Sequence, residues 1–483
     1  MGYREIDKAI NEIKNAIKKE YEAHNYENVL ELVYLCSHIL YTTNFCYVDE
    51  YLERVIEELS PFLVKGAEKY EGNNNKVLFW DGFGLNSRGL AQIYIKALVK
   101  YKNVIYVTYE RYKNRIPDIL QILNENSGYC RFIREEKYVN QVTQLEEIVK
   151  EVQPGHFFFY SKPTDVVAPI IMHGYVGKIR RYQINLTDHA YWLGSRPIDE
   201  CIEYRNYGAN ISLKERKIAQ KAIRIIPYYP VIDYDREFQG YPFEFNEKSQ
   251  KLIFSGGALY KTLGGQNQYY KIVDMILEKH NDVIFWYAGN GDRRKIDTLI
   301  KKYPNRVFLT GERQDLYQVM QKCRLYLSTF PMSGGLMIQY ACIAGKVPVT
   351  LQLGAVNDGV LLNQDALGAF FNETEELIKE VDKLLTDKTY AEERGKLMEK
   401  SVPLEQQFAD EVKKALNREI GEYSVYVTDV ESREFCQQFW DRFDEKRIDQ
   451  LFLNKKNFFT YLKYFKKRIS LGLIYTIHEK MKR

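Results

Sequence analysis

One stretch, residues 324–349, limits the possible folds more than any other part of the chain. It opens with an apolar run (RLYLS) typical of a buried strand, and a Ser333-Gly334-Gly335 turn then leads into two turns of apolar helix. Gly345 ends that helix, and Val347-Pro348-Val349 begins another buried strand. A glycine turn before a helix offers unpaired N–H groups and the positive end of the helix dipole. The stretch therefore predicts either a phosphate-binding loop or an ordinary strand-to-helix turn.

The same order of strand, loop and helix recurs along the chain in two series. The first runs from a buried-type strand at Val77–Trp80 to a short strand at Ala222–Pro227, and the second begins at Lys251. An aromatic connector that contains prolines, Tyr228–Phe245, lies between them. Strands that alternate with helices of this length predict parallel sheets with crossover helices on both faces. We therefore expect an α/β fold with two Rossmann-like domains that face each other across a cleft.

Helical patterns flank the two series. Isoleucines recur at helical spacing near the N-terminus, at positions 6, 10, 13 and 17. We expect residues 1–72 to form an N-terminal helical extension that ends at a polar break, Gly72–Asn75. The first α/β domain is expected at residues 76–240, the second at 250–403, and a group of C-terminal helices at 404–483.

The formal charge of the chain is +4, and it is unevenly distributed. Residues 451–483 hold nine Lys or Arg against one acid and are rich in aromatic side chains. A mild overall charge argues against nucleic-acid binding. Aromatic and basic residues on one helix indicate a peripheral anchor on an anionic membrane. The alternative is a helix packed on the protein with its basic face in water.

The cysteines and the distribution of apolar residues indicate in which cellular compartment the protein is expected. The seven cysteines show no CxxC pair, and no histidine cluster has metal-ligand spacing, so we expect reduced thiols and no metal site. The charged N-terminal sequence predicts no signal peptide, and no apolar run reaches 18 residues. We therefore expect a cytoplasmic protein, placed at the inner face of the cell membrane if the C-terminal anchor operates.

Three glycine loops of the second series are predicted to share one edge of its sheet. Strands end in Ser255-Gly256-Gly257 and in Ala288-Gly289-Asn290-Gly291, and the third loop is Ser333–Gly335. Loops at the carboxyl ends of parallel strands surround the ligand site of an open α/β sheet. Together the three loops favour a bound nucleotide. In the first series, a weaker signal of the same kind follows the first strand at Gly84, with Arg88 beside it.

These features together resemble a GT-B glycosyltransferase. Two Rossmann-like halves, the glycine loops and an Asp188-His189 turn after a strand carry the resemblance over roughly Lys76–Ser401. The second half is similar to the retaining, nucleotide-sugar-dependent family that includes bacterial capsule, lipopolysaccharide and wall-polysaccharide enzymes. The resemblance implies transfer of a sugar from a nucleoside-diphosphate sugar, with UDP the most common carrier, to a glycan or lipid-linked acceptor. It implies no cofactor beyond this co-substrate.

The most diagnostic family residues are altered in this chain. That family usually has two glutamates seven residues apart, and their positions fall on Met332 and Tyr340. Ala258 stands where the family has an arginine that contacts the donor diphosphate, so Lys261 is the nearest cation. Arg313 is expected to supply a second charge. Without a metal, such cations and a helix N-terminus stabilise the charge on a departing diphosphate.

The resemblance implies a set of site residues. His189 and Asp188 are the catalytic candidates, each able to act as a general base if the reaction inverts the anomeric centre. The expected substrate-binding residues are Gly84, Arg88, Gly256, Gly257, Lys261, Gly289, Gly291, Arg313, Ser333, Gly334, Gly335 and Gln339. Two alternatives stay open: a catalytically silent GT-B module that serves as a binding or scaffold subunit, and a nucleotide-sugar epimerase.

Overall fold

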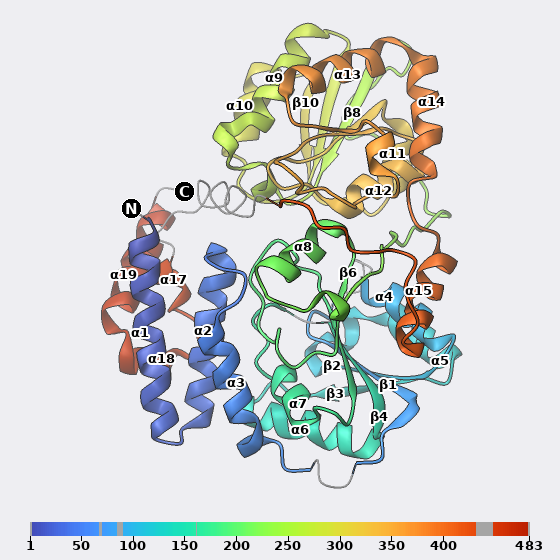
Figure 1. Ribbon diagram of the computed structural model, residues 1–483. Helices are drawn as coiled ribbons and strands as arrows, with labels where there is room; N and C mark the ends of the chain where they lie inside the picture. The colour runs from blue at the N-terminus through green and yellow to red at the C-terminus, as the bar shows by residue number, and fades with distance from the viewer. Residues whose placement is uncertain (1, 67–69, 85–89, 161, 431–447, 482–483) are drawn as a thin grey trace.

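The computed structural model describes residues 2–66, 70–84, 90–160, 162–430 and 448–481. Two domains are each built around one β-sheet (Figure 1). The first sheet has the strand order β3-β2-β1-β4-β5-β6-β7. Its strands are β1 (Asn73–Asp81), β2 (Asn103–Tyr109), β3 (Tyr129–Ile133), β4 (Pro154–Tyr160), β5 (Arg180–Ile184), β6 (Glu200–Glu203) and β7 (Ile223–Ile225).

The second sheet repeats this topology in the order β10-β9-β8-β11-β12-β13. Its strands are β8 (Lys251–Gly256), β9 (Val283–Ala288), β10 (Val307–Thr310), β11 (Leu325–Leu327), β12 (Pro348–Leu351) and β13 (Phe370–Phe371). The strand pairings in both sheets are parallel. Each sheet places its first strand beside its fourth, which creates the switch point where ligands bind in doubly wound folds. The prediction of an α/β protein with two Rossmann-like domains is confirmed.

Crossover helices cover both faces of the first sheet. On one face lie α4 (Leu90–Val99) and α5 (Pro117–Glu125), and on the other lie α6 (Tyr138–Val152) and α7 (Ala168–Gly174). Helix α15 (Glu405–Asn417) returns from the C-terminal side of the chain to pack beside α4 (Figure 1). Its Phe408 ring lies 5.0 Å from that of Tyr94. The C-terminal part of the chain thus contributes to the core of the first domain.

The helices of the second domain surround its sheet in the same way. They are α9 (Gln268–Lys279), α10 (Arg294–Lys302), α11 (Leu316–Lys322), α12 (Gly335–Ile343), α13 (Thr374–Thr386) and α14 (Lys388–Glu399). The stretch around α12 folds as its sequence predicts, from strand β11 through the glycine turn to helix and strand β12. Gly345 follows α12 with φ +68°, a left-handed conformation that glycine adopts without strain and that ends the helix.

Both ends of the chain join in one helical unit beside the first domain. Helices α1 (Gly2–Glu22), α2 (Tyr26–Thr43) and α3 (Glu50–Leu63) pack against α17 (Ile448–Leu451), α18 (Phe458–Tyr464) and α19 (Lys466–Met481) (Figure 1). The recurring isoleucines of α1 are all buried in this shared core. Arg468 on α19 pairs with Glu12 on α1 at 2.6 Å, and Lys463 on α18 pairs with Glu20 at 2.5 Å.

The polar residues expected to break the chain belong instead to a strand. Asn73–Asn75 are exposed, yet they form the first part of β1. The backbone N–H of Asn73 donates to Gln153 O at 2.8 Å, and the register with β4 shifts before Val77. Backbone pairing with β4 extends the strand beyond the buried part of the sheet, where polar side chains face water. Within the described ranges, none of the helices combines the length and the apolar character needed to cross a membrane.

Candidate active site

A pocket of about 620 Å³ lies between the two domains. From the second domain it is lined by the loops that follow β8 and β10, by Ala288 at the end of β9, and by the start of α12. From the first domain come His189 and Leu186 after β5, and Tyr204 and Arg205 after β6. The connector between the domains adds Tyr228, so the pocket contacts both sheets at their carboxyl ends, as expected for a ligand site in open α/β sheets.

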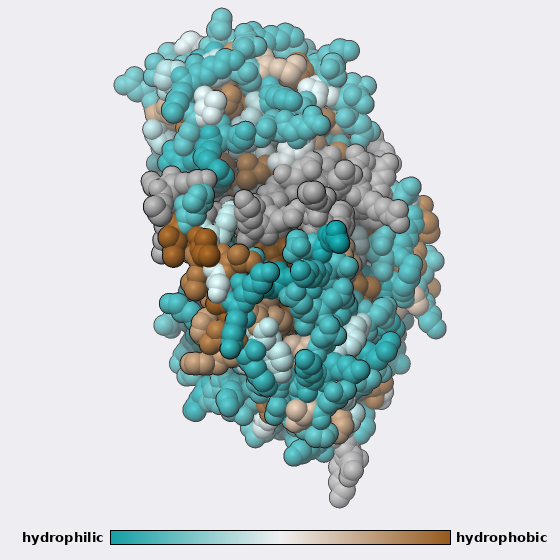
Figure 2. Space-filling view, turned by 90° about the vertical axis from the view of Figure 1, so that its left-hand side faces the viewer, coloured by the Kyte–Doolittle hydropathy of each residue, from teal (hydrophilic) through white to brown (hydrophobic). Residues whose placement is uncertain are grey.

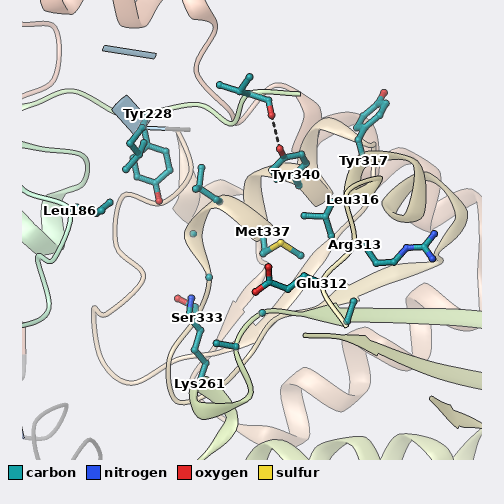
Figure 3. Close-up of a pocket in the computed structure, with 18 of the residues that line it drawn as sticks. Leu186, Tyr228, Lys261, Glu312, Arg313, Leu316, Tyr317, Ser333, Met337 and Tyr340 are labelled. Atoms are coloured by element: carbon teal, nitrogen blue, oxygen red, sulfur yellow. Dashed lines mark hydrogen bonds between the residues drawn. The ribbon is translucent and has the colours of Figure 1, made fainter. Parts of the chain in front are cut away.

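The part of the pocket best suited to an anion lies at the start of α12. Gly334 is the N-cap of this helix and supplies no side-chain cap, so the first N–H groups of α12 face the loop Ser333–Gly335. A Cβ placed on Gly334 would lie 3.6 Å from Lys261 Nζ, and Figure 3 shows the Lys261 side chain beside Ser333. The Ser333 hydroxyl donates a hydrogen bond to Asn357 Oδ1. One cation and a helix N-terminus therefore meet in this corner.

Of the other predicted glycines, Gly257 lines the pocket, and Gly256, Gly289 and Gly291 do not. Gly289 has a structural role, because a Cβ there would lie only 1.9 Å from the Gly257 carbonyl oxygen. A side chain at position 289 would thus push apart the loops after β8 and β9. These three glycines shape the pocket by backbone packing and do not form its wall.

The structure does not bring Arg313 and Lys261 together as two cations on one phosphate. The Arg313 guanidinium binds the buried Asp315 carboxylate through Nε at 2.8 Å and Nη2 at 2.6 Å, and it lies over the Trp286 ring. In Figure 3 it points away from Ser333 and Lys261. Arg313 lines the pocket, but its charge is compensated by Asp315. The expectation that it supplies a second diphosphate charge is therefore corrected.

Gln339, unlike Arg313, does not line the pocket. Its buried side chain donates to the carbonyl oxygens of Tyr228, at 2.9 Å, and Val360, at 3.2 Å. The Tyr340 hydroxyl donates to Val231 O at 2.6 Å, the dashed line in Figure 3. Gln339 and Tyr340 therefore fasten α12 to the connector between the domains. At the two positions where the related family has glutamates, Met332 and Tyr340 both line the pocket.

Across the pocket, His189 belongs to a buried polar group. Its Nδ1 lies 3.2 Å from Asp188 Oδ1, and its side chain is 25% exposed. Asp188 is fully buried and accepts from Arg205 Nε at 2.5 Å and Nη2 at 3.0 Å. The Arg205 charge and hydrogen bonds from both neighbours outweigh burial and hold the pKa of Asp188 well below its usual range. Burial lowers the pKa of His189.

This arrangement gives the two catalytic candidates, Asp188 and His189, different chemical roles. Asp188 is paired with Arg205, and a carboxylate with so low a pKa is a weak proton acceptor. The carboxylate can only accept, so Nδ1 of His189 carries the proton and Nε2 carries the lone pair. Asp188 therefore orients the histidine, and the expectation that Asp188 is itself a general base is corrected.

The loop that carries His189 is held by the N-terminal helical extension. Asn44, at the end of α2, donates from Nδ2 to His189 O at 3.1 Å. The buried Glu53 carboxylate of α3 accepts backbone N–H groups from Gly194, Ser195 and Arg196 at 2.9, 3.1 and 3.3 Å. Burial raises the pKa of Glu53 to about 7 despite these hydrogen bonds. The extension thus supports the loop from the side opposite the pocket.

The sequence prediction missed five charged residues that line the pocket: Asp118, Arg205, Asp233, Arg236 and Glu312. Arg205 lies two residues after the end of β6 and is the partner of Asp188, and its place near the carboxyl end of a strand was the available signal. Glu312 lies next to the predicted Arg313, and Figure 3 shows its side chain reaching toward Met337 in the middle of the pocket. Gly84 does not line this pocket, and Arg88 lies outside the described residues. In the described part of the chain there is no group of His, Cys, Asp or Glu that could hold a metal ion.

Comparisons with known proteins agree with this architecture. Residues 249–387 match the family model of the glycosyl transferases group 1. No curated protein matches the sequence. Among solved structures, a mutant O-GlcNAc transferase of Thermobaculum terrenum is similar at a TM-score of 0.55 and 12% identity, covering 90% of this chain and 82% of that chain. This likeness extends the agreement in fold to most of the chain.

A weaker likeness is to HepE of Anabaena in complex with UDP and glucose. It has 14% identity and a TM-score of 0.49, and it covers 71% of this chain and 100% of that chain. The second domain is therefore similar in sequence to the glycosyl transferases group 1, at residues 249–387, and the chain with its two parallel sheets is similar in fold to the Thermobaculum terrenum transferase.

Proposed function

We propose that this protein transfers a sugar from a nucleoside-diphosphate sugar, with UDP as the preferred carrier, to a glycan or lipid-linked acceptor in the synthesis of a bacterial surface polysaccharide. The observation that carries the proposal is the corner of the pocket where Lys261 meets the N-terminus of α12. It lies at the carboxyl end of the second sheet, inside the domain that matches the glycosyl transferases group 1.

The chemistry of that corner suits a departing diphosphate. Cleavage of the bond between sugar and phosphate leaves growing negative charge on the phosphate oxygens. Fixed N–H groups, a helix dipole and one ammonium group stabilise such charge without reorganising during the reaction. In this proposal Lys261 and the N–H groups of Gly334 and Gly335 bind the diphosphate, and the transfer is independent of metal ions.

His189 is proposed as the group that takes the proton from the acceptor hydroxyl. It lines the first-domain side of the pocket, across from Lys261, and Asp188 holds its ring in the tautomer with a lone pair on Nε2. Arg205 compensates the Asp188 charge, which favours a neutral imidazole at pH 7. In this arrangement Asp188 and Arg205 position the base, and only His189 contacts the reacting atoms.

The C-terminal helices are proposed to contact an anionic membrane at its cytoplasmic face. Helix α19 exposes Leu471, Leu473, Ile474 and Ile477, and α18 exposes Phe459. Lys463, Lys466 and Lys467 are exposed on the same two helices. Figure 2 shows a hydrophobic patch on the face that contains this unit. Exposed apolar side chains next to lysines favour the surface of an anionic bilayer, while Phe465 and Ile469 fasten the helices to the protein.

Thermal denaturation with nucleoside diphosphates tests the donor site. UDP should raise the melting temperature of the wild-type protein, because a ligand that binds only the folded state stabilises it. The increase should disappear in Lys261→Ala and persist in Lys301→Ala, a matched change of an exposed lysine on α10. Equal stabilisation of both variants, or none by UDP, GDP or ADP, would contradict the assignment. Incubation with nucleotide sugar alone separates transfer from epimerisation, which needs no acceptor.

A further inference from the structure

A second cavity, of about 280 Å³, lies at the carboxyl edge of the first sheet. It shares no lining residue with the pocket between the domains. Three distant parts of the chain enclose it: Tyr34 of α2, the loops that follow β1 to β4, and Asn454 and Lys456 near the C-terminus. Because β1 and β4 are neighbours, the cavity lies at the switch point of this sheet, where doubly wound folds bind ligands.

Two cations on one side of this cavity are held against a single oxygen atom. The Tyr112 hydroxyl oxygen accepts from Arg111 Nη2 at 2.7 Å and from Lys162 Nζ at 2.9 Å. Like charges this close repel each other, and the Glu135 carboxylate, 2.7 Å from Arg111, relieves part of this repulsion. Gly84 permits this arrangement, because a Cβ at that position would lie 2.1 Å from the Tyr112 ring. The predicted glycine loop thus serves the second cavity by giving room to Tyr112.

A third cation comes from the opposite end of the chain. Lys456 Nζ lies 4.4 Å from the centre of the Tyr138 ring, and burial lowers the pKa of this lysine. Within the described residues, neither Lys162 nor Lys456 forms a salt bridge with a carboxylate. The cavity therefore has two ammonium groups that form no salt bridge with a described carboxylate.

The carboxylates of the cavity are already occupied. Glu135 pairs with Arg111 at 2.7 Å. Asp165 accepts from Trp80 Nε1 at 2.8 Å and from the backbone N–H groups of Val167 and Ala168 at 2.8 and 3.1 Å. These bonds leave Lys162 and Lys456 as the charges available to a ligand. The cavity therefore favours an anion.

Tyrosine rings form much of the remaining wall. Tyr34, Tyr109 and Tyr138 line the cavity, and the rings of Tyr34 and Tyr138 stack with centroids 6.0 Å apart. Aromatic faces combined with hydroxyl groups suit the mixed apolar and polar surface of a sugar ring. The volume is near the lower end of the range of ligand pockets, about 300–1,000 Å³, so one small ligand fits and an oligosaccharide does not.

We propose that this cavity binds a sugar phosphate, with the phosphate between Lys162 and Lys456 and the sugar against the tyrosine rings. The further assignment of this group to the acceptor rests on the proposed function. The phosphate is either that of a free sugar phosphate or the one that joins a sugar to a lipid carrier. Lys456 belongs to the C-terminal segment that continues into α18, so the cavity adjoins the helices proposed to contact the membrane.

Isothermal titration calorimetry of the full-length protein tests this site. Glucose 1-phosphate should bind more tightly than inorganic phosphate, because only the former contacts the tyrosines. Lys456→Ala and Lys162→Ala should each weaken its binding about tenfold, the loss expected for one charge-assisted hydrogen bond. Lys455→Ala is the matched control, since Lys455 is exposed next to Lys456 but does not line the cavity. UDP binding should be unchanged in all three variants.

Four results would overturn the proposal. Equal affinity of the wild type and Lys456→Ala for glucose 1-phosphate would show that the ligand does not bind in this cavity. A lack of binding of glucose 1-phosphate to the wild type would also contradict the proposal. Displacement of glucose 1-phosphate by UDP would show that glucose 1-phosphate binds in the pocket between the domains and not in this cavity. Displacement by vesicles of phosphatidylglycerol would show that the cavity takes lipid headgroups, whereas lack of competition supports the sugar phosphate. If UDP itself fails to bind, the proposed function fails, and the calorimetry of glucose 1-phosphate still decides this site.

Discussion

At the scale of single residues, the site depends on how buried charges are compensated. Arg205 neutralises Asp188, and Asp188 in turn fixes the ring of His189. Asp315 compensates Arg313 in the second domain, so Lys261 is left as the cation beside the start of α12. Breaking a buried charge pair costs several kcal/mol, because the remaining charge is left without a partner in a medium of low polarity. Both pairs therefore hold fixed positions around the pocket.

The pH dependence of turnover tests the role of His189. Burial lowers its pKa from the usual value of 6.5, so the neutral, proton-accepting form persists to lower pH. The acid limb of kcat should therefore fall below pH 6.5, and His189→Gln should lower kcat about 100-fold and remove that limb. Rate measurements from pH 4.5 to 8.5 check this. An unchanged limb in the variant, or a change in KM alone, would assign His189 to binding only.

At the scale of elements, the N-terminal extension supports the His189 loop. Helices α2 and α3 contact this loop through Ser37, Asn44 and Glu53, from a part of the chain about 140 residues away in sequence. Glu53 is the most unusual of these contacts, because it buries a carboxylate against three backbone N–H groups. The extension is therefore a structural support of the candidate active site.

Glu53 should make the stability of the protein depend on pH in a defined direction. Its folded-state pKa of about 7 lies above the usual value of 4.5, so the folded state binds the proton more tightly than the unfolded state does. The free energy of unfolding should therefore fall between pH 4.5 and 7, by on the order of 3 kcal/mol from this group. Urea denaturation of the wild type and Glu53→Gln at pH 5 and pH 8 measures this. A difference between the two proteins that is independent of pH would contradict it.

Individual elements show how far the sequence determines the site. Hydrophobic periodicity was sufficient to predict the glycine turn before α12 and the strands of both sheets other than β6 and β13, because burial and backbone geometry are local in sequence. The partners of side chains are set by tertiary contacts, which the pattern does not contain. Arg313 forms an ion pair with Asp315, and Gln339 donates to the carbonyl oxygens of Tyr228 and Val360. Gly84 packs against the Tyr112 ring. The second cavity was missed for the same reason, since Tyr34 and Lys456 are far apart in sequence.

At the scale of the whole molecule, contacts beyond the connector join the two domains at the pocket. Arg205 Nη1 donates to Val356 O at 2.6 Å, and Asn206 Nδ2 donates to Asp358 Oδ2 at 2.9 Å. The arginine that neutralises Asp188 thus also contacts the second domain. The helical unit built from both chain ends lies beside the first domain (Figure 1), so the membrane contact proposed above would act on that domain.

Vesicle co-sedimentation tests the membrane contact. Binding to phosphatidylglycerol vesicles should fall about fivefold for each of Lys466→Ala and Lys467→Ala, since each lysine near an anionic surface contributes about 1 kcal/mol. Leu471→Ser with Ile474→Ser should weaken binding further by removing exposed apolar area. Lys301→Ala, on the second domain, is the control and should bind as the wild type does. Equal sedimentation of all variants, or no effect of added salt, would contradict the contact.

The release of UDP from UDP-sugars tests the central claim most directly. The wild-type protein, given a panel of UDP-sugars with candidate acceptors, should release UDP from at least one of them. Lys261→Ala should slow this release about 100-fold, the effect of removing one group that stabilises charge in the transition state, while Lys301→Ala should release UDP at the wild-type rate. No release from any UDP-sugar, or release at the same rate by Lys261→Ala, would contradict the account.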